Sequence, residues 1–199
     1  MEFVADGLRW NSPVVVFAAS AVLLSLERLA YAWIWQRPDA FCSLVERARM
    51  GSPVKALERC FYLFKAIQVA TFTLWCIYFG ELHGWPRAEL SPLALLAVAL
   101  IVVGQVLNAA VFLKLGRVGV FYGNRFGHRV AWVEGFPFSL VDHPQYVGTL
   151  MTIWGVFLLL RYPFGDWIVL PALSTLYYAC GMFAESREPV QEAERLGGL

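Results

Sequence analysis

Residues 92–113 read PLALLAVALIVVGQVLNAAVFL, an apolar run without a charged residue. A helix of this length crosses the roughly 30 Å hydrocarbon core of a bilayer, because each residue advances the helix by about 1.5 Å. In lipid the backbone polar groups must be paired within the segment itself, and a helix achieves this. The stretch therefore predicts a transmembrane helix.

Four further apolar runs flank this one, at about residues 13–35, 60–80, 146–160 and 164–184. The run at 146–160 is short for a full span, so the number of spans is four or five. The composition agrees, because 59% of the 199 residues are hydrophobic and 16% are charged, whereas soluble domains carry about 25% charged residues. The sequence predicts an all-α integral membrane helical bundle of four to five transmembrane helices, forming a single domain over residues 1–199.

The charged residues and cysteines exclude several classes of function. A net charge of +1 gives no broad basic surface of the kind that binds nucleic acid. The four cysteines are scattered without the spacing of a zinc site, so we expect no metal.

The basic residues orient the predicted bundle. Segments 36–59 and 114–144 contain five and four Lys or Arg residues, whereas segment 81–91 contains one. Because cytoplasmic loops carry the excess of Lys and Arg, we expect both basic segments and the C-terminus to face the cytoplasm. The membrane would be that of the endoplasmic reticulum in a eukaryote or the cytoplasmic membrane in a bacterium.

Ionisable residues also interrupt the predicted spans. Glu27 and Arg28 are adjacent inside the first run, and Lys65 lies near one end of the second. Such residues are costly in lipid and usually face a bundle interior. The alternative is that Glu27 and Arg28 lie on a partly immersed helix with their charges at the interface.

Most of the remaining polar detail lies between residues 116 and 148 and near residue 185. The four glycines between Gly116 and Gly127 allow positive φ angles and close approach to a ligand, or they form loop turns. His143 precedes Pro144 at a predicted helix start and is either functional or a boundary residue. Glu185 and Glu188 are three residues apart and share a helix face, either facing a ligand or in a solvated helix end.

From Gly104 onward the chain resembles the phospholipid N-methyltransferases, the membrane enzymes that make phosphatidylcholine, and most closely the plant-type phosphatidyl-N-methylethanolamine N-methyltransferase. The shared pieces are Gly104-Gln105-x-Leu107-Asn108, Leu115-Gly116, Gly119, Tyr122-Gly123-x-Arg125-Phe126-Gly127, Trp132-Val133, Phe136-Pro137-Phe138, Pro144-Gln145-Tyr146-Val147-Gly148 and Glu185-Ser186-x-Glu188. The first 90 residues match in hydropathy alone. The chain departs from the animal form at two places. The first donor-binding element, in the third predicted span, keeps one glycine, Gly104, where the animal form has two. The C-terminal glutamates, Glu185 and Glu188, are separated, whereas those of the animal form are adjacent.

The resemblance implies transfer of methyl groups from S-adenosylmethionine to the amine of phosphatidylethanolamine and its mono- and dimethyl derivatives, with membrane phospholipid as partner. It places the donor-binding and catalytic core in residues 91–199. The residues expected to bind the donor are Gly104, Tyr122, Gly123, Arg125, Gly127, His143, Pro144, Gly148, Glu185 and Glu188. The residues expected to take part in catalysis are His143, Asp142 and Tyr146.

The residue types suggest individual roles. Tyrosine faces such as Tyr122 and Tyr146 can hold a sulfonium cation, and Arg125 can pair with the donor's carboxylate or the lipid phosphate. His143 would either accept a proton from the amine or shape the donor-binding loop, and we favour the second role. Two alternative functions remain: a carboxyl methyltransferase of prenylated cysteine, and a membrane scaffold without enzymatic activity.

Overall fold

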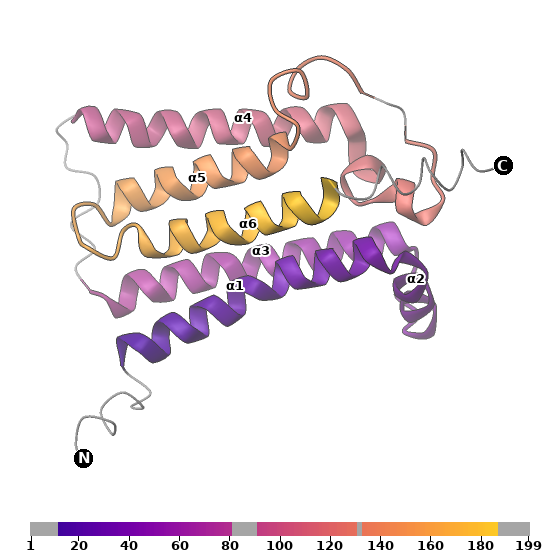
Figure 1. The fold of residues 1–199 in the computed structure, drawn as a ribbon, viewed down its shortest axis with the longest axis horizontal. Helices are drawn as coiled ribbons and strands as arrows, with labels where there is room; N and C mark the ends of the chain where they lie inside the picture. Colours follow the sequence, from indigo (N-terminus) through magenta and orange to yellow (C-terminus); the bar gives the residue numbers. More distant parts are fainter. Residues whose placement is uncertain (1–11, 81–90, 131–132, 187–199) are drawn as a thin grey trace.

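The computed structural model describes residues 12–80, 91–130 and 133–186, and these residues form a helical bundle (Figure 1). The helices are α1 (Pro13–Gln36), α2 (Pro38–Arg47), α3 (Pro53–Tyr78), α4 (Pro92–Val120), the short 3-10 helix η2 (Gly123–Phe126), α5 (Pro144–Leu160) and α6 (Val169–Ser186). By length and composition, α1, α3 and α4 could each cross a membrane, and α5 is a shorter apolar helix. The prediction of an all-α membrane bundle is confirmed.

The long helices lie side by side, whereas α2 lies across one end of the bundle (Figure 1). The same end carries η2, the described parts of the segment between η2 and α5, and the end of α6. We call this the η2 end. The two basic segments predicted to share one membrane face therefore lie at the same end of the molecule.

Three of the long helices begin with a serine followed by a proline. Ser12, Ser52 and Ser91 are the N-cap residues of α1, α3 and α4, and each side chain accepts a hydrogen bond from a backbone N–H of the first turn. A proline at the first helical position has no N–H to leave unsatisfied, so the pair starts a helix efficiently. In α5 the proline is present, but the preceding residue is His143, whose side chain makes no capping hydrogen bond.

Each long helix packs against the next in the series α3, α1, α6, α5, α4. We call this the open packing order, because its two end members, α3 and α4, are not a closely packed pair. The contact between α4 and α5 is by far the most extensive. Near the η2 end the rings of Phe61 and Phe112 bridge α3 and α4 with their centroids 6.3 Å apart. The space between α3 and α4 is therefore closed mainly by side chains at one end.

Two buried apolar clusters hold this arrangement. At the η2 end, Phe41 and Val45 of α2 pack with residues of α1 and α3 and with Phe121. Further along the bundle, Trp75, Phe157 and Leu170 belong to a cluster that joins α3, α5 and α6. Burying a side chain of this size contributes about 1.5–3 kcal/mol, so α2 is fixed to the bundle by its own apolar face.

At the end opposite η2, Arg161 joins the α5–α6 turn to the end of α3. Its side chain is 1% exposed, and it donates hydrogen bonds to both carboxylate oxygens of Asp166 (2.9 and 2.6 Å) and to the carbonyl oxygen of Gly80 (2.8 Å). Trp75 of α3 donates to the same carboxylate at 2.9 Å. Burial of the Asp166 carboxyl would raise its pKa, but the hydrogen bonds from Arg161 and Trp75 outweigh it, so the pKa lies below its ordinary value.

The predicted boundaries differ from the observed ones near the η2 end. Helix α4 was expected to end near residue 113, but it runs to Val120 with a break at Gly116, whose φ and ψ are 61° and −179°. Glycine is the residue that adopts such angles readily. Helix α2 lies within a segment predicted as a basic loop, and α3 begins at Pro53 rather than near residue 60. In each case charged residues of a helical turn were mistaken for a loop.

Candidate functional site

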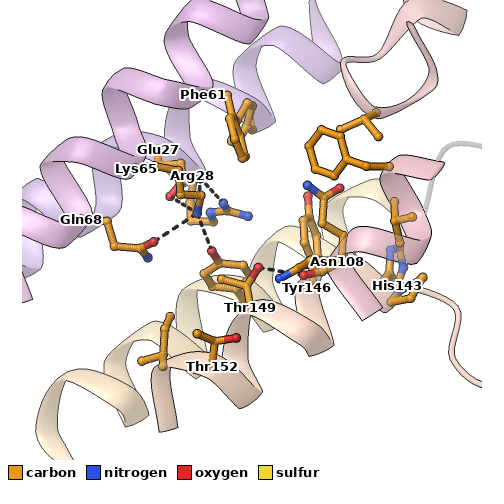
Figure 2. A pocket seen from close by; sticks show the side chains of 18 of the residues that line it. Glu27, Arg28, Phe61, Lys65, Gln68, Asn108, His143, Tyr146, Thr149 and Thr152 are labelled. Atoms are coloured by element: carbon orange, nitrogen blue, oxygen red, sulfur yellow. Dashed lines mark hydrogen bonds and ion pairs between the residues drawn. The ribbon is translucent and has the colours of Figure 1, made fainter. Parts of the chain in front are cut away.

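A cavity of about 1620 Å³ lies inside the bundle, bounded by α3 on one side and by α4 and α5 on the other. Side chains of α1 and α6 also line it. Figure 2 shows Glu27, Arg28, Lys65 and Gln68 on the α1–α3 side of this space, with Tyr146, Thr149 and Thr152 on α5 facing them. The cavity volume of 1620 Å³ exceeds the 300–1,000 Å³ of ordinary small-molecule pockets.

The cavity changes in character along its length. At the η2 end it is lined by polar and aromatic side chains that include Tyr122, His143 and Glu185. Toward the other end its lining becomes apolar, with Phe72 and Ile77 of α3 and Phe157 and Leu160 of α5. One end can therefore receive a polar group and the other an apolar chain.

Three predicted residues from three different elements meet at the η2 end. The hydroxyl of Tyr122 donates to Oε1 of Glu185 at 2.7 Å, and the hydroxyl of Tyr146 donates to the same oxygen at 2.5 Å. The ring of Tyr122 also packs edge-on against Trp35, with centroids 5.0 Å apart. A carboxylate held among aromatic rings is a suitable site for an organic cation. We call Tyr122, Tyr146 and Glu185 the tyrosine–glutamate site.

The backbone around Tyr122 brings its ring into the cavity. Tyr122 has a φ of 54° and a ψ of 31°, a left-handed conformation that costs a non-glycine residue about 1–3 kcal/mol. The next residue, Gly123, permits the tight turn, because a Cβ there would lie 2.3 Å from Cγ1 of Val118. The closely packed loop thus holds Tyr122 in an orientation that the residue would not adopt by itself.

His143 and Asp142 also line the η2 end of the cavity. The imidazole ring of His143 lies parallel to the ring of Tyr146, with centroids 5.7 Å apart and an angle of 11° between the planes. Asp142 is exposed to solvent. These two residues therefore connect the tyrosine–glutamate site with the water-accessible surface, and Pro144 beside them begins α5.

Arg125 and its neighbouring glycines lie beside the cavity and are not among the residues that line it. The guanidinium of Arg125 lies 4.6 Å from the ring centre of Trp35 and donates to that residue's carbonyl oxygen at 2.5 Å. Gly127 ends η2 with a φ of 80°. Arg125 thus fastens η2 to the end of α1, and its predicted role toward donor or phosphate remains a prediction.

Gly104 and Gly148 are explained by helix packing. A Cβ on Gly104 would lie 2.4 Å from the carbonyl oxygen of Gly148, and a Cβ on Gly148 would lie 2.6 Å from the carbonyl oxygen of Gly104. The two glycines let the backbones of α4 and α5 touch, as small residues do between membrane helices. Neither lines the cavity, so their donor-binding role also remains a prediction. Glu188 lies outside the described residues.

Sequence reasoning left a second polar group out of the predicted site. Glu27 and Arg28 of α1 and Lys65 of α3 line the cavity next to Tyr146. Arg28 lies 5.2 Å from the ring centre of Tyr146. The sequence feature that could have identified them is the presence of ionisable residues inside apolar runs, which in membrane proteins marks a candidate functional site.

Several buried polar atoms of the cavity lack a hydrogen-bond partner among the described residues. They include Oδ1 of Asn108 and Nε1 of Trp35, together with Nε and Nη1 of Arg28. Such atoms are rare, because leaving a buried donor or acceptor unpaired costs about 1–3 kcal/mol. The four atoms belong to side chains that line the same cavity.

Comparisons with known proteins agree with this geometry. The family model described as phospholipid methyltransferase matches residues 93–187. The chain is 34% identical over 175 residues to the phosphatidyl-N-methylethanolamine N-methyltransferase of Arabidopsis thaliana, which covers 87% of this chain and 93% of the relative. It is 32% identical over 139 residues to the human phosphatidylethanolamine N-methyltransferase, covering 68% and 67% of the two chains. No solved structure gives a significant match.

Proposed function

Because the chain belongs to the phospholipid methyltransferase family of membrane enzymes, we propose that it methylates the amine of phosphatidylethanolamine and of its mono- and dimethyl derivatives. The donor would be S-adenosylmethionine and the final product phosphatidylcholine. The observation that carries the proposal is the tyrosine–glutamate site at the polar end of a cavity whose other end is apolar. A phospholipid has the same division between its headgroup and its acyl chains.

The residues at the η2 end fit the proposed donor. Asn108 offers a buried acceptor and Trp35 a buried N–H donor, each without a hydrogen-bond partner among the described residues. An adenosine group needs both kinds of partner. The rings of Tyr122 and Tyr146 and the carboxylate of Glu185 provide the negative environment that a sulfonium cation requires. When bound, the donor supplies an electrophilic methyl group.

The protein must also free the lone pair of the headgroup nitrogen. An amine with a pKa of about 10 holds its proton at pH 7, and releasing it costs roughly 4 kcal/mol. The groups that line the η2 end and can accept a proton are Asp142, His143 and Glu185. Asp142 is exposed, so a proton taken up at this end can pass to water.

We also propose that the η2 end faces the cytoplasm. The basic segments 36–59 and 114–144 both belong to this end (Figure 1), and excess Lys and Arg favours the cytoplasmic side. The water-soluble donor would then reach the site from the cytoplasm. Single cysteines placed at Arg47 and Asp142 should react with a membrane-impermeant reagent from that side.

Methyl transfer to defined lipids tests the function. Purified protein in vesicles would be incubated with methyl-labelled S-adenosylmethionine and one of phosphatidylethanolamine or its mono- and dimethyl derivatives. We expect label in the headgroup of at least the monomethyl lipid. A protein that labels an added prenylated cysteine and none of the three headgroups would overturn the proposal.

A further inference from the structure

Arg28 is a buried arginine whose hydrogen-bonding capacity is largely unused within the described residues. Its side chain is 10% exposed, and its Nη2 pairs with Oε1 of Glu27 at 2.7 Å. Nε and Nη1 are buried without a hydrogen-bond partner among the described residues. A guanidinium keeps its charge under all ordinary conditions and offers five N–H donors, so Nε and Nη1 of Arg28 require an acceptor that the described residues do not supply.

Three aromatic rings hold the guanidinium of Arg28 beside the carboxylate of Glu27. Its Cζ lies 4.0 Å from the ring centre of Tyr178, 5.2 Å from that of Tyr146 and 5.3 Å from that of Tyr31. Rings in this arrangement attract a cation by about 2 kcal/mol or more where water is excluded. The rings carry no formal charge, so they fix the position of the guanidinium, while its charge is balanced by the carboxylate of Glu27.

Glu27 cannot balance both of the cations that it contacts. Lys65 Nζ lies 3.1 Å from Glu27 Oε1 and donates to Oε1 of Gln68 at 3.1 Å and to the hydroxyl of Tyr178 at 3.2 Å. These acceptors use the three donors of an ammonium group. By formal charge, Glu27, Arg28 and Lys65 comprise two cations and one carboxylate. The next carboxylate that lines the cavity, Glu185, is already held in the tyrosine–glutamate site. An anion that enters the cavity can therefore pair with one cation of the group, and a buried charge is costly without such a partner.

The position of Arg28 along the cavity indicates which anion this is. Its neighbour Tyr146 donates to Glu185 in the tyrosine–glutamate site, and beyond Arg28 the lining becomes apolar toward Phe157 and Leu160. The order from the η2 end is a cation site, an anion site and an apolar region. A phospholipid presents its amine, its phosphodiester and its acyl chains in the same order.

We propose that Arg28, held by Glu27 and Lys65, binds the phosphodiester of the phospholipid substrate while the amine lies at the tyrosine–glutamate site. The inference rests on the proposed function for the identity of the lipid. Both Arg28 and Lys65 lie before residue 93, where the match to the family model begins. The N-terminal helices thus contribute headgroup recognition to a site whose other residues come from the matched region (Figure 2).

The test compares Arg28→Gln with Arg47→Gln, a control at an exposed position on α2. Each protein would be given a monomethylethanolamine phospholipid and an otherwise identical lipid in which a neutral linker replaces the phosphate. The phosphate preference is the ratio of the two kcat/KM values. We expect it to fall about 10- to 150-fold in Arg28→Gln, the loss typical of a hydrogen bond to a charged group, and to stay unchanged in Arg47→Gln. An unchanged ratio in Arg28→Gln would overturn the proposal.

The donor's carboxylate is the other oxyanion that Arg28 could meet. S-adenosylhomocysteine carries this carboxylate and methylthioadenosine does not. Comparing their inhibition constants in wild type and Arg28→Gln therefore shows whether Arg28 binds the donor's carboxylate or the lipid phosphodiester. We expect both constants to be unchanged. Selective weakening of S-adenosylhomocysteine would overturn the phosphodiester assignment. If Arg28→Gln does not fold, the same ratio is measured in Arg28→Lys, which keeps the positive charge but loses the paired N–H groups that bind a phosphate through two hydrogen bonds.

A binding measurement separates this proposal from the proposed function. Phosphorus NMR of the monomethyl phospholipid bound to the purified protein reports on the phosphate without any turnover. Suppose that the wild-type protein methylates no headgroup, but that lipid binding shifts its phosphorus resonance and that this shift disappears in Arg28→Gln. This result would overturn the proposed function and keep the phosphate site. A shift that is identical in both proteins would overturn the phosphate site alone.

Discussion

Two arginines inside the bundle, Arg28 and Arg161, are 10% and 1% exposed and have opposite surroundings. Each nitrogen of the Arg161 guanidinium faces an oxygen of Asp166 or Gly80, whereas two of the three nitrogens of Arg28 have no hydrogen-bond partner among the described residues. Arg161 joins the α5–α6 turn to α3, and Arg28 lines the cavity. A buried charge that is fully satisfied within the protein stabilises the fold, and one that is left incomplete indicates a ligand.

The largest effect is expected at the satisfied arginine. Arg161→Met leaves Asp166 buried without its counter-charge, and breaking a buried ion pair in this way costs about 3–5 kcal/mol. We expect the thermal midpoint of the purified protein to drop sharply, while the phosphate preference of the remaining folded protein stays that of the wild type. A change in that preference without a loss of stability would remove the distinction between the two arginines.

The next largest effect is expected on donor binding at the tyrosine–glutamate site, which lies beside Arg28. Glu185→Gln keeps the size of the side chain and removes its charge, which should weaken donor binding by about 1.5–3 kcal/mol, or roughly 10- to 150-fold. Calorimetry with S-adenosylhomocysteine and with S-adenosylmethionine would show whether the loss concerns the cationic ligand. Glu46→Gln, at an exposed position on α2, provides the comparison, and an equal loss there would mean that the carboxylate held by Tyr122 and Tyr146 has no special role.

A smaller effect is expected at His143. Its parallel contact with Tyr146 is worth about 0.5–1.5 kcal/mol, so His143→Ala should weaken donor binding by up to about tenfold. If the residue only positions the donor-binding loop, raising the pH should not restore activity. Loss of turnover by 10²–10⁴ with unchanged donor binding and rescue at high pH would instead identify His143 as the proton acceptor.

The smallest effect is a loss of folding stability at low pH, caused by protonation of Asp166 beside Arg161. The folded-state pKa of Asp166 lies below its ordinary value of 3.8, so its contribution is present above that value and is lost as the pH falls through the folded pKa. We expect the thermal midpoint of wild type to decrease below about pH 4 more steeply than that of Asp166→Asn. Parallel curves for the two proteins would show that the carboxylate does not contribute.

The sequence predicted the elements of this fold better than their ends. Long apolar runs determine helices in lipid, so the bundle followed directly. The break at Gly116 and the short α2 could not be read from hydropathy, because charged residues are compatible with both a loop and an interfacial helix. The helix start at His143-Pro144 was predicted from the sequence, but the serine–proline start of α1, α3 and α4, from which α5 departs, was not noticed.

The site was predicted in part, for a similar reason. Tyr122, Tyr146 and Glu185 were named from motifs and do meet. Gly104 and Gly148 were named from the same motifs, although their position is explained by contact between α4 and α5. A motif records that a residue type is required without stating whether a ligand or a neighbouring helix requires it. Arg28 and Lys65 converge from separate helices, and a single sequence does not show which spans face each other.

The open packing order of the helices has a consequence for the range of lipids that the enzyme can process. Since α3 and α4 lie at opposite ends of that order, the gap between them can widen without separating any closely packed helix pair. Acyl chains that extend into it would meet a wall that adapts to their length and unsaturation. We therefore expect broad tolerance of fatty acids, so that a mixed membrane pool of molecular species is converted at similar rates.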